Sequence, residues 1–101
     1  MDIAQFNEEL ITTLEKPELL TRPGIDQKFD GQYVAIQFTD DLFSNGLGYV
    51  VATGEKTDAV YKELSYYLRY LHQSNGMSGR VGVANKTRDE DELYVVFSNS
   101  Q

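Results

Sequence analysis

Alternating apolar and polar positions mark four short segments of the chain as β-strands. In the first of them, Val34, Ile36 and Phe38 alternate with more polar neighbours, which is the period-two pattern of a half-buried strand. Asn45 and Gly46 separate the first two segments and tolerate the positive φ angles of a chain reversal. The four segments cover residues 32–38, 47–53, 80–85 and 93–98.

Helical periodicity predicts a first helix near the start of the sequence. Asp2 and Gln5 have the spacing of a capping box, and Pro17 is expected to end the helix. Residues 22–24, Arg-Pro-Gly, are typical of a turn. The apolar stripe of this helix consists of Ile3, Phe6, Leu10, Ile11 and Leu14.

A second and longer helix is predicted after the second strand. Either Thr57 or Asp58 can cap its start, and the helix runs to about Ser74. Asn75 and Gly76 are expected to end it, because glycine adopts the left-handed conformation that closes many helices.

The elements occur in the order α-β-β-α-β-β. Short loops within each strand pair favour one four-stranded antiparallel sheet, with both helices packed on one face. The other face is expected to carry Tyr33, Gln37 and Tyr94. A chain of 101 residues is the size of one ordinary domain, so we expect a single acidic α+β domain over residues 1–101.

The second helix contains four of the seven tyrosines of the chain. At 100° per residue, Tyr61 and Tyr67 fall on the apolar face, within an arc of roughly 120°. Tyr66 and Tyr70 point elsewhere and form an aromatic ridge of i,i+4 neighbours. Three interpretations remain open for this ridge: a loop such as residues 17–30 covers it, it mediates self-association, or it is a hot spot for another protein.

The net charge of −7 indicates which kinds of partner the protein can bind. Residues 1–58 contain eleven acidic and four basic side chains, whereas residues 59–101 contain five of each. This balance disfavours direct binding of nucleic acid, because phosphates would be repelled, and favours a partner with a basic surface. With no cysteine, no signal-peptide pattern and no long apolar run, we expect a cytoplasmic protein without a membrane segment.

No motif predicts catalysis. His72 is the only histidine, and no serine or carboxylate has a spacing that would orient it as a base. Residues 54–57, Gly-Glu-Lys-Thr, lie between a strand and a helix as a phosphate-binding loop does, but Glu55 separates the glycine from the lysine and would repel phosphate. The acidic run at residues 89–92 lacks the ligand spacing of a calcium loop. We therefore expect no catalytic, cofactor-binding or metal-binding residues, and no enzyme.

The expected function is binding to another protein through acidic side chains and aromatic anchors. The loop at residues 39–46 combines two acids with two large apolar side chains that must pack on the core or contact a partner. The three glutamates selected from the first predicted helix lie off its apolar stripe and are expected to face water. The candidate protein-binding residues are Tyr66, Tyr70, Asp40, Asp41, Phe43, Glu8, Glu9 and Glu15.

In size, acidity and lack of catalytic residues, the sequence is similar to phage-encoded inhibitors of host defence or DNA-processing proteins, among them DNA-mimicking anti-restriction and anti-CRISPR proteins. The resemblance implies that carboxylates take the place of phosphates in a basic groove of the target. In this sequence those groups would be Glu8, Glu9, Glu15, Asp40 and Asp41, with Tyr66 and Tyr70 as the anchors.

An alternative comes from the order of the predicted elements. A helix, paired strands, a long helix and a final strand pair resemble the small acidic chaperones of bacterial type III secretion, which implies a homodimer with Tyr66 and Tyr70 in its interface. One strand before the second helix and a final helix are missing from that pattern. An immunity protein that neutralises a basic toxin fits the same charge and size.

Overall fold

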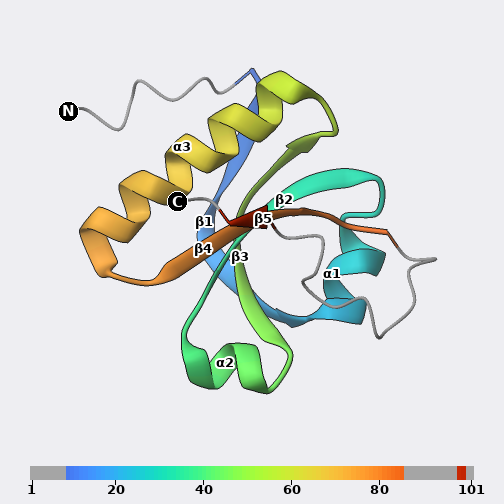
Figure 1. Ribbon diagram of the computed structural model, residues 1–101. Helices are drawn as coiled ribbons and strands as arrows, with labels where there is room; N and C mark the ends of the chain where they lie inside the picture. Colours follow the sequence, from blue (N-terminus) through green and yellow to red (C-terminus); the bar gives the residue numbers. More distant parts are fainter. Residues whose placement is uncertain (1–8, 86–97, 100–101) are drawn as a thin grey trace.

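The computed structural model describes residues 9–85 and the backbone of residues 98–99 (Figure 1). Four long strands and one short strand form a single antiparallel sheet in the order β1-β3-β2-β4-β5. The strands are β1 (Ile11–Thr21), β2 (Gln32–Phe38), β3 (Leu47–Glu55), β4 (Ser78–Val83) and β5 (Ser98–Asn99). The helices are α1 (Arg22–Lys28), α2 (Asp40–Ser44) and α3 (Asp58–Asn75).

The α+β class and the antiparallel sheet are confirmed, as are β2, β3, α3 and β4 close to their predicted bounds. The strand predicted over residues 93–98 lies outside the described residues except for Ser98, which pairs with Val81. The first predicted element and the placement of the helices are wrong, and each has a physical reason.

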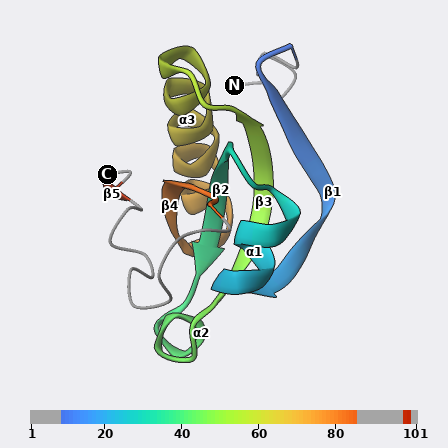
Figure 2. The same ribbon diagram turned by 90° about the vertical axis from the view of Figure 1, so that its right-hand side faces the viewer.

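The two central strands are buried on both faces, and the helices cover opposite faces of the sheet (Figures 1 and 2). On one face, α3 packs Val60, Leu64, Tyr67 and Leu68 against a cluster that includes Ala35. On the other, Ile25 of α1 packs against the β2 side chains predicted to be apolar and buried, which are Val34, Ile36 and Phe38. The expectation of both helices on one face is therefore wrong.

Tyr33 and Gln37 were expected on an open face, but α3 covers that face. The rings of Tyr33 and Tyr61 meet edge to face, with centroids 5.5 Å apart. Gln37 is buried, and its side-chain amide exchanges two hydrogen bonds with that of Asn75, at 3.3 and 3.1 Å. A buried amide is tolerated when its polar atoms are paired, so a polar residue in an alternating strand does not require an open face. Tyr94 lies outside the described residues.

Residues 11–16 were predicted to continue the first helix, but they belong to β1, and residues 1–8 lie outside the described part of the chain. β1 pairs with β3 at both ends, and the register shifts between Thr13 and Glu18. Pro17 lies within this irregular section, where a missing backbone N–H breaks no ladder hydrogen bond. Pairing with β3 therefore overrides the local helical spacing.

Two short helices were not predicted. The turn expected at residues 22–24 is the first turn of α1, where Pro is tolerated, and the Thr21 hydroxyl accepts a hydrogen bond from the Gly24 N–H at 3.3 Å. The loop expected at residues 39–46 contains α2, which begins in the same way: the Thr39 hydroxyl accepts from the Leu42 N–H at 3.3 Å. In both cases a threonine cap outweighs the turn-forming residues nearby.

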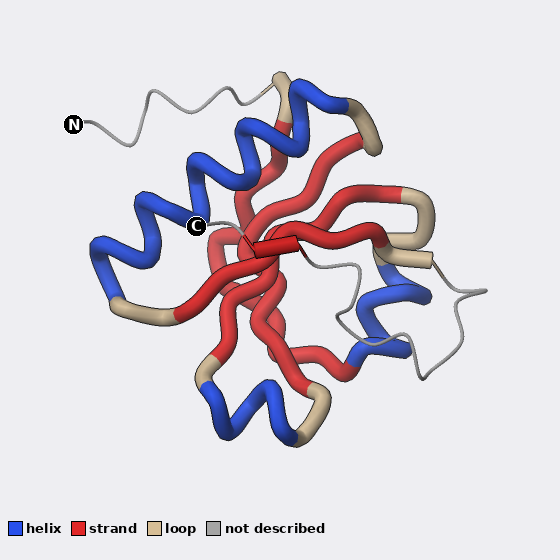
Figure 3. Tube along the Cα trace, viewed as in Figure 1, coloured by secondary structure: helices blue, strands red, loops and turns tan. Residues whose placement is uncertain are grey.

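Helix α3 begins and ends as predicted. The Thr57 hydroxyl accepts a hydrogen bond from the Val60 N–H at 3.2 Å, and Gly76 closes the helix with a φ of 75°. Helix α3 crosses one face of the sheet diagonally, from the end of β3 to the start of β4 (Figure 3).

We expect Thr57→Ala to lower the free energy of unfolding by about 0.5–2 kcal/mol, because the Val60 N–H loses its acceptor. Thr57→Ser keeps a hydroxyl at the same position and should stay close to the wild type. Urea denaturation of the three proteins measures this difference, and equal stability of the alanine and serine variants would contradict the assigned cap.

Candidate functional site

The structure distributes the predicted binding residues over three places. Asp40, Asp41 and Phe43 lie together on α2. Glu15 is exposed on β1, and Glu9 precedes that strand at its other end from Thr21. Tyr66 and Tyr70 lie on α3, and Glu8 is outside the described residues. The described members of the predicted set therefore do not form one continuous face, and among them only those on α2 combine acids with an aromatic side chain.

Helix α2 connects β2 and β3 at one end of the sheet (Figures 1 and 2). Asp40 and Asp41 are exposed in its first turn, where the partial positive charge of the helix start stabilises carboxylates. Among residues 9–85, neither carboxylate takes part in an ion pair. Their charge is therefore directed at solvent.

Phe43 lies on the same short helix and is 43% exposed. Its ring contacts that of Phe38 with centroids 5.1 Å apart, and the neighbouring Leu42 packs against the core. The two apolar residues of this segment therefore have different roles. Leu42 anchors α2 to the sheet, and Phe43 covers Phe38 while part of its own ring stays exposed. A partly exposed aromatic ring held by a core residue is a suitable anchor for a protein partner.

The ridge predicted from Tyr66 and Tyr70 is uneven. Tyr66 is 38% exposed, whereas Tyr70 is half-buried and packs against the α3 core. The two residues predicted to lie on the core face, Tyr61 and Tyr67, are both part of or adjacent to that core. Tyr66 is therefore the most exposed of the four tyrosines on this helix.

Burial raises the pKa of Tyr67 above its usual value of 10.0, and the nearby Tyr70 raises it further by opposing a second negative charge. The folded chain therefore holds the neutral phenol to a higher pH than the unfolded chain does. This contribution to stability is complete below pH 10 and is lost as the pH rises through the folded-state pKa.

We expect the wild type to lose stability above about pH 10 more steeply than Tyr67→Phe, which has no phenol to ionise at this position. Urea denaturation at pH 8, 10 and 11 measures the effect as the difference between the two slopes. Tyr66→Phe is the control, since Tyr66 lies on the exposed side of the same helix. Equal slopes for wild type and Tyr67→Phe would show that burial does not hold this phenol neutral.

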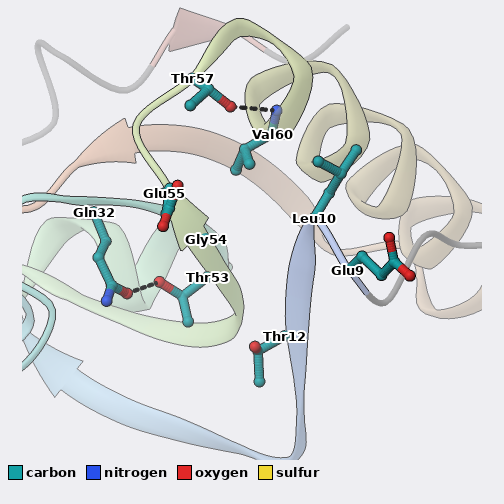
Figure 4. A pocket seen from close by; sticks show the side chains of 9 residues that line it. All are labelled: Glu9, Leu10, Thr12, Gln32, Thr53, Gly54, Glu55, Thr57 and Val60. Atoms are coloured by element: carbon teal, nitrogen blue, oxygen red, sulfur yellow. Dashed lines mark hydrogen bonds between the residues drawn. The ribbon is translucent and has the colours of Figure 1, made fainter.

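A cavity of about 440 Å³ lies at the end of the sheet opposite α2, between the start of β1, the end of β3 and the start of α3 (Figure 4). Two apolar side chains, Leu10 and Val60, line it together with polar ones. The Thr53 hydroxyl donates to the Gln32 side-chain oxygen at 2.6 Å and fixes one wall. The polar lining residues are Glu9, Thr12, Gln32, Thr53, Glu55 and Thr57.

Sequence patterns did not predict this cavity, because its walls come from four segments that only the strand pairing brings together. Glu55 faces Gln32 across β2 and β3, and Ile11 faces Gly54 across β1 and β3. One local signal was present: residues 54–57 cover the end of β3 and the two residues that connect it to α3. The glutamate that argued against phosphate there is one of the cavity's acidic groups.

Metal binding, histidine chemistry and membrane insertion have little support in the described residues. No three His, Cys, Asp or Glu side chains gather in residues 9–85 where they could hold a metal ion. His72 is exposed, with Nδ1 3.0 Å from the Met77 carbonyl oxygen. No helix in the described part of the chain combines the length and apolar character needed to cross a membrane.

Comparison of the chain with protein-family models, with curated proteins and with solved structures gave no match.

Proposed function

We propose that the protein is a non-catalytic binding protein that inhibits a basic nucleic-acid-handling protein, in the manner of DNA-mimicking anti-restriction and anti-CRISPR proteins. The observation that carries the proposal is the composition of α2. Two exposed carboxylates and a 43% exposed phenylalanine share one five-residue helix at an end of the sheet.

The chemistry of α2 suits a groove that normally binds phosphates. Asp40 and Asp41 supply adjacent negative charges that can pair with arginine or lysine side chains of the target. Phe43 supplies apolar contact area beside them, and aromatic anchors with a charged rim are typical of protein interfaces. Opposite charge on the two partners would also speed association at low salt.

Two observations count against the dimeric chaperone alternative. It depended on a leading helix, and residues 11–21 form β1. Tyr70, one of the two expected interface residues, packs against the core of its own chain. An immunity protein would use the same acidic helix, and only the identity of the captured target distinguishes it from an inhibitor of a nucleic-acid-handling protein.

Affinity capture from nuclease-treated lysate tests the proposal. The bait is the wild type, compared with an Asp40→Asn, Asp41→Asn, Phe43→Ala variant. We expect the wild type to retain a basic nucleic-acid-handling protein at 50 mM salt, and the α2 variant to retain at least tenfold less, because its paired charges and its aromatic anchor are gone.

A charge-matched control keeps the comparison specific. Asp30→Asn with Asp58→Asn also removes two negative charges, but at the end of the sheet opposite α2, beside the start of β2 and the end of β3. We expect this double variant to capture the same partner as the wild type. Equal capture by all three baits, or capture that 500 mM salt leaves unchanged, would contradict the role of α2.

A further inference from the structure

The cavity at the end opposite α2 has a built polar wall. The Thr53 hydroxyl bridges the Gln32 side-chain oxygen at 2.6 Å and the Tyr33 carbonyl oxygen at 2.9 Å. The Thr57 hydroxyl is occupied as the acceptor for the Val60 N–H. Two of the three lining hydroxyls therefore serve the protein's own structure, and the two charged side chains in the lining, Glu9 and Glu55, are both acidic (Figure 4).

Glu55 is the carboxylate that is best placed to bind a ligand in this cavity. It follows Gly54 at the end of β3, and its side chain lies at the cavity beside Gln32 (Figure 4). In the described part of the chain, its carboxylate has neither a hydrogen bond nor an ion pair. Glu9 contributes the second acid to the lining, and Lys56, although next in sequence to Glu55, does not line the cavity.

The acidic side chains at and near the cavity disfavour the binding of an anion. The start of α3 would attract one by its partial positive charge, but Asp58 already occupies its first turn. Glu55 and Glu9 add negative charge at the cavity itself. A divalent metal ion is also disfavoured, because residues 9–85 provide no group of three ligating side chains.

The apolar part of the lining narrows the class of ligand. Leu10 and Val60 form an aliphatic wall beside the acids. A guanidinium or ammonium group on an aliphatic stem would match both parts, with its charge at the carboxylates and its methylene groups on the apolar wall. A cavity of about 440 Å³ is large enough for such a group.

We propose that this cavity binds an alkyl cation, a guanidinium or ammonium group carried on an aliphatic chain, with Glu55 as its main charge partner. The cation is either a free small molecule or an arginine or lysine side chain of another protein. This inference does not rest on the role of α2, because the two sites lie at opposite ends of β2 and β3.

The test is an NMR titration of the ¹⁵N-labelled full chain with N-butylguanidinium. Backbone amide signals of Gln32, Gly54, Glu55 and Thr57 should shift with saturation, with a dissociation constant on the order of 1 mM for so small a ligand. N-butylurea has the same shape and no charge, and it should produce no saturable shifts. Saturable binding of both compounds alike would overturn the cation specificity.

Two variants locate the site. Glu55→Gln keeps the size of the side chain and removes its charge, so binding should weaken about threefold to tenfold. Asp30→Asn removes the same charge from an exposed residue outside the cavity lining and should leave the affinity unchanged. If Glu55→Gln binds as tightly as the wild type while its spectrum remains that of the folded protein, the proposal is wrong.

A capped tripeptide, acetyl-Gly-Arg-Gly-amide, distinguishes the two sources of the cation. Saturable shifts of the same signals with the tripeptide would assign the cavity to an arginine side chain of a protein. Shifts with N-butylguanidinium alone would assign it to a free small molecule. The absence of saturable shifts with either probe overturns the proposal, and that result leaves the α2 capture experiment unaffected.

Discussion

Replacing Leu64 with alanine is expected to lower the free energy of unfolding by about 2–5 kcal/mol. Leu64 is fully buried in the centre of α3, within the cluster that joins this helix to the sheet. The substitution removes three carbon atoms from a close-packed interior and leaves a cavity that the neighbouring strands cannot fill. For a domain of this size, such a loss is a large share of the total stability.

Guanidinium denaturation followed by circular dichroism measures this effect. Lys62→Ala is the matched control, because it truncates an exposed side chain one half-turn away on the same helix. Its stability should stay within about 0.5 kcal/mol of the wild type. Similar losses for the two variants would mean that Leu64 is not in the core between α3 and the sheet.

Replacing Gly54 with alanine is expected to cost about 1–3 kcal/mol, although it adds a single methyl group. A Cβ atom at this position would lie 2.7 Å from the Leu10 carbonyl oxygen and 2.7 Å from Val60 Cγ1. The first contact is with backbone, so the start of β1 would have to move. The second would push the first turn of α3 away from the sheet.

Gly24→Ala is the control for this substitution. The nearest atom to a Cβ at Gly24 is the Thr21 hydroxyl oxygen at 3.4 Å, which is an ordinary contact. Its stability should differ from the wild type by only a few tenths of a kcal/mol, within the scatter of surface changes. If both alanine variants unfold at the same denaturant concentration, the close approach of β1 and α3 at Gly54 is wrong.

Local patterns correctly predicted the elements whose structure is determined mainly by their own sequence. Helix α3 has an apolar stripe from Val60 to Leu71, a threonine cap and a closing glycine, and all three signals agree. Strand β2 alternates as expected, but both of its faces are buried. Gln37 can be buried because its side-chain amide is hydrogen-bonded to Asn75, 38 residues away. No local pattern can reveal that pairing.

β1 shows where two signals conflicted. The spacing of Leu10, Ile11 and Leu14 suits a helix, whereas Ile11 and the two threonines after it favour a strand. These residues form a strand because they hydrogen-bond to the edge of β3, which is a tertiary interaction. Pro17 looked like a helix end and proved to be part of the irregular section of an edge strand.

The candidate site was predicted in part. Asp40, Asp41 and Phe43 were selected as a group, and the structure keeps them together because Thr39 caps a short helix there. Glu9 and Glu15 were selected for their position off a helical stripe, and that helix does not include residues 11–16. The cavity required the register of three strands, which no single segment encodes.

Competition for the captured partner tests the central claim most directly. A fluorescent oligonucleotide is bound to the partner, and the protein is then titrated in at 100 mM salt. If α2 occupies the nucleic-acid groove of the partner, the wild type displaces the oligonucleotide completely, and at least tenfold more of the Asp40→Asn, Asp41→Asn, Phe43→Ala variant is needed. A ternary complex, in which partner, oligonucleotide and wild type remain together, would contradict this role of α2.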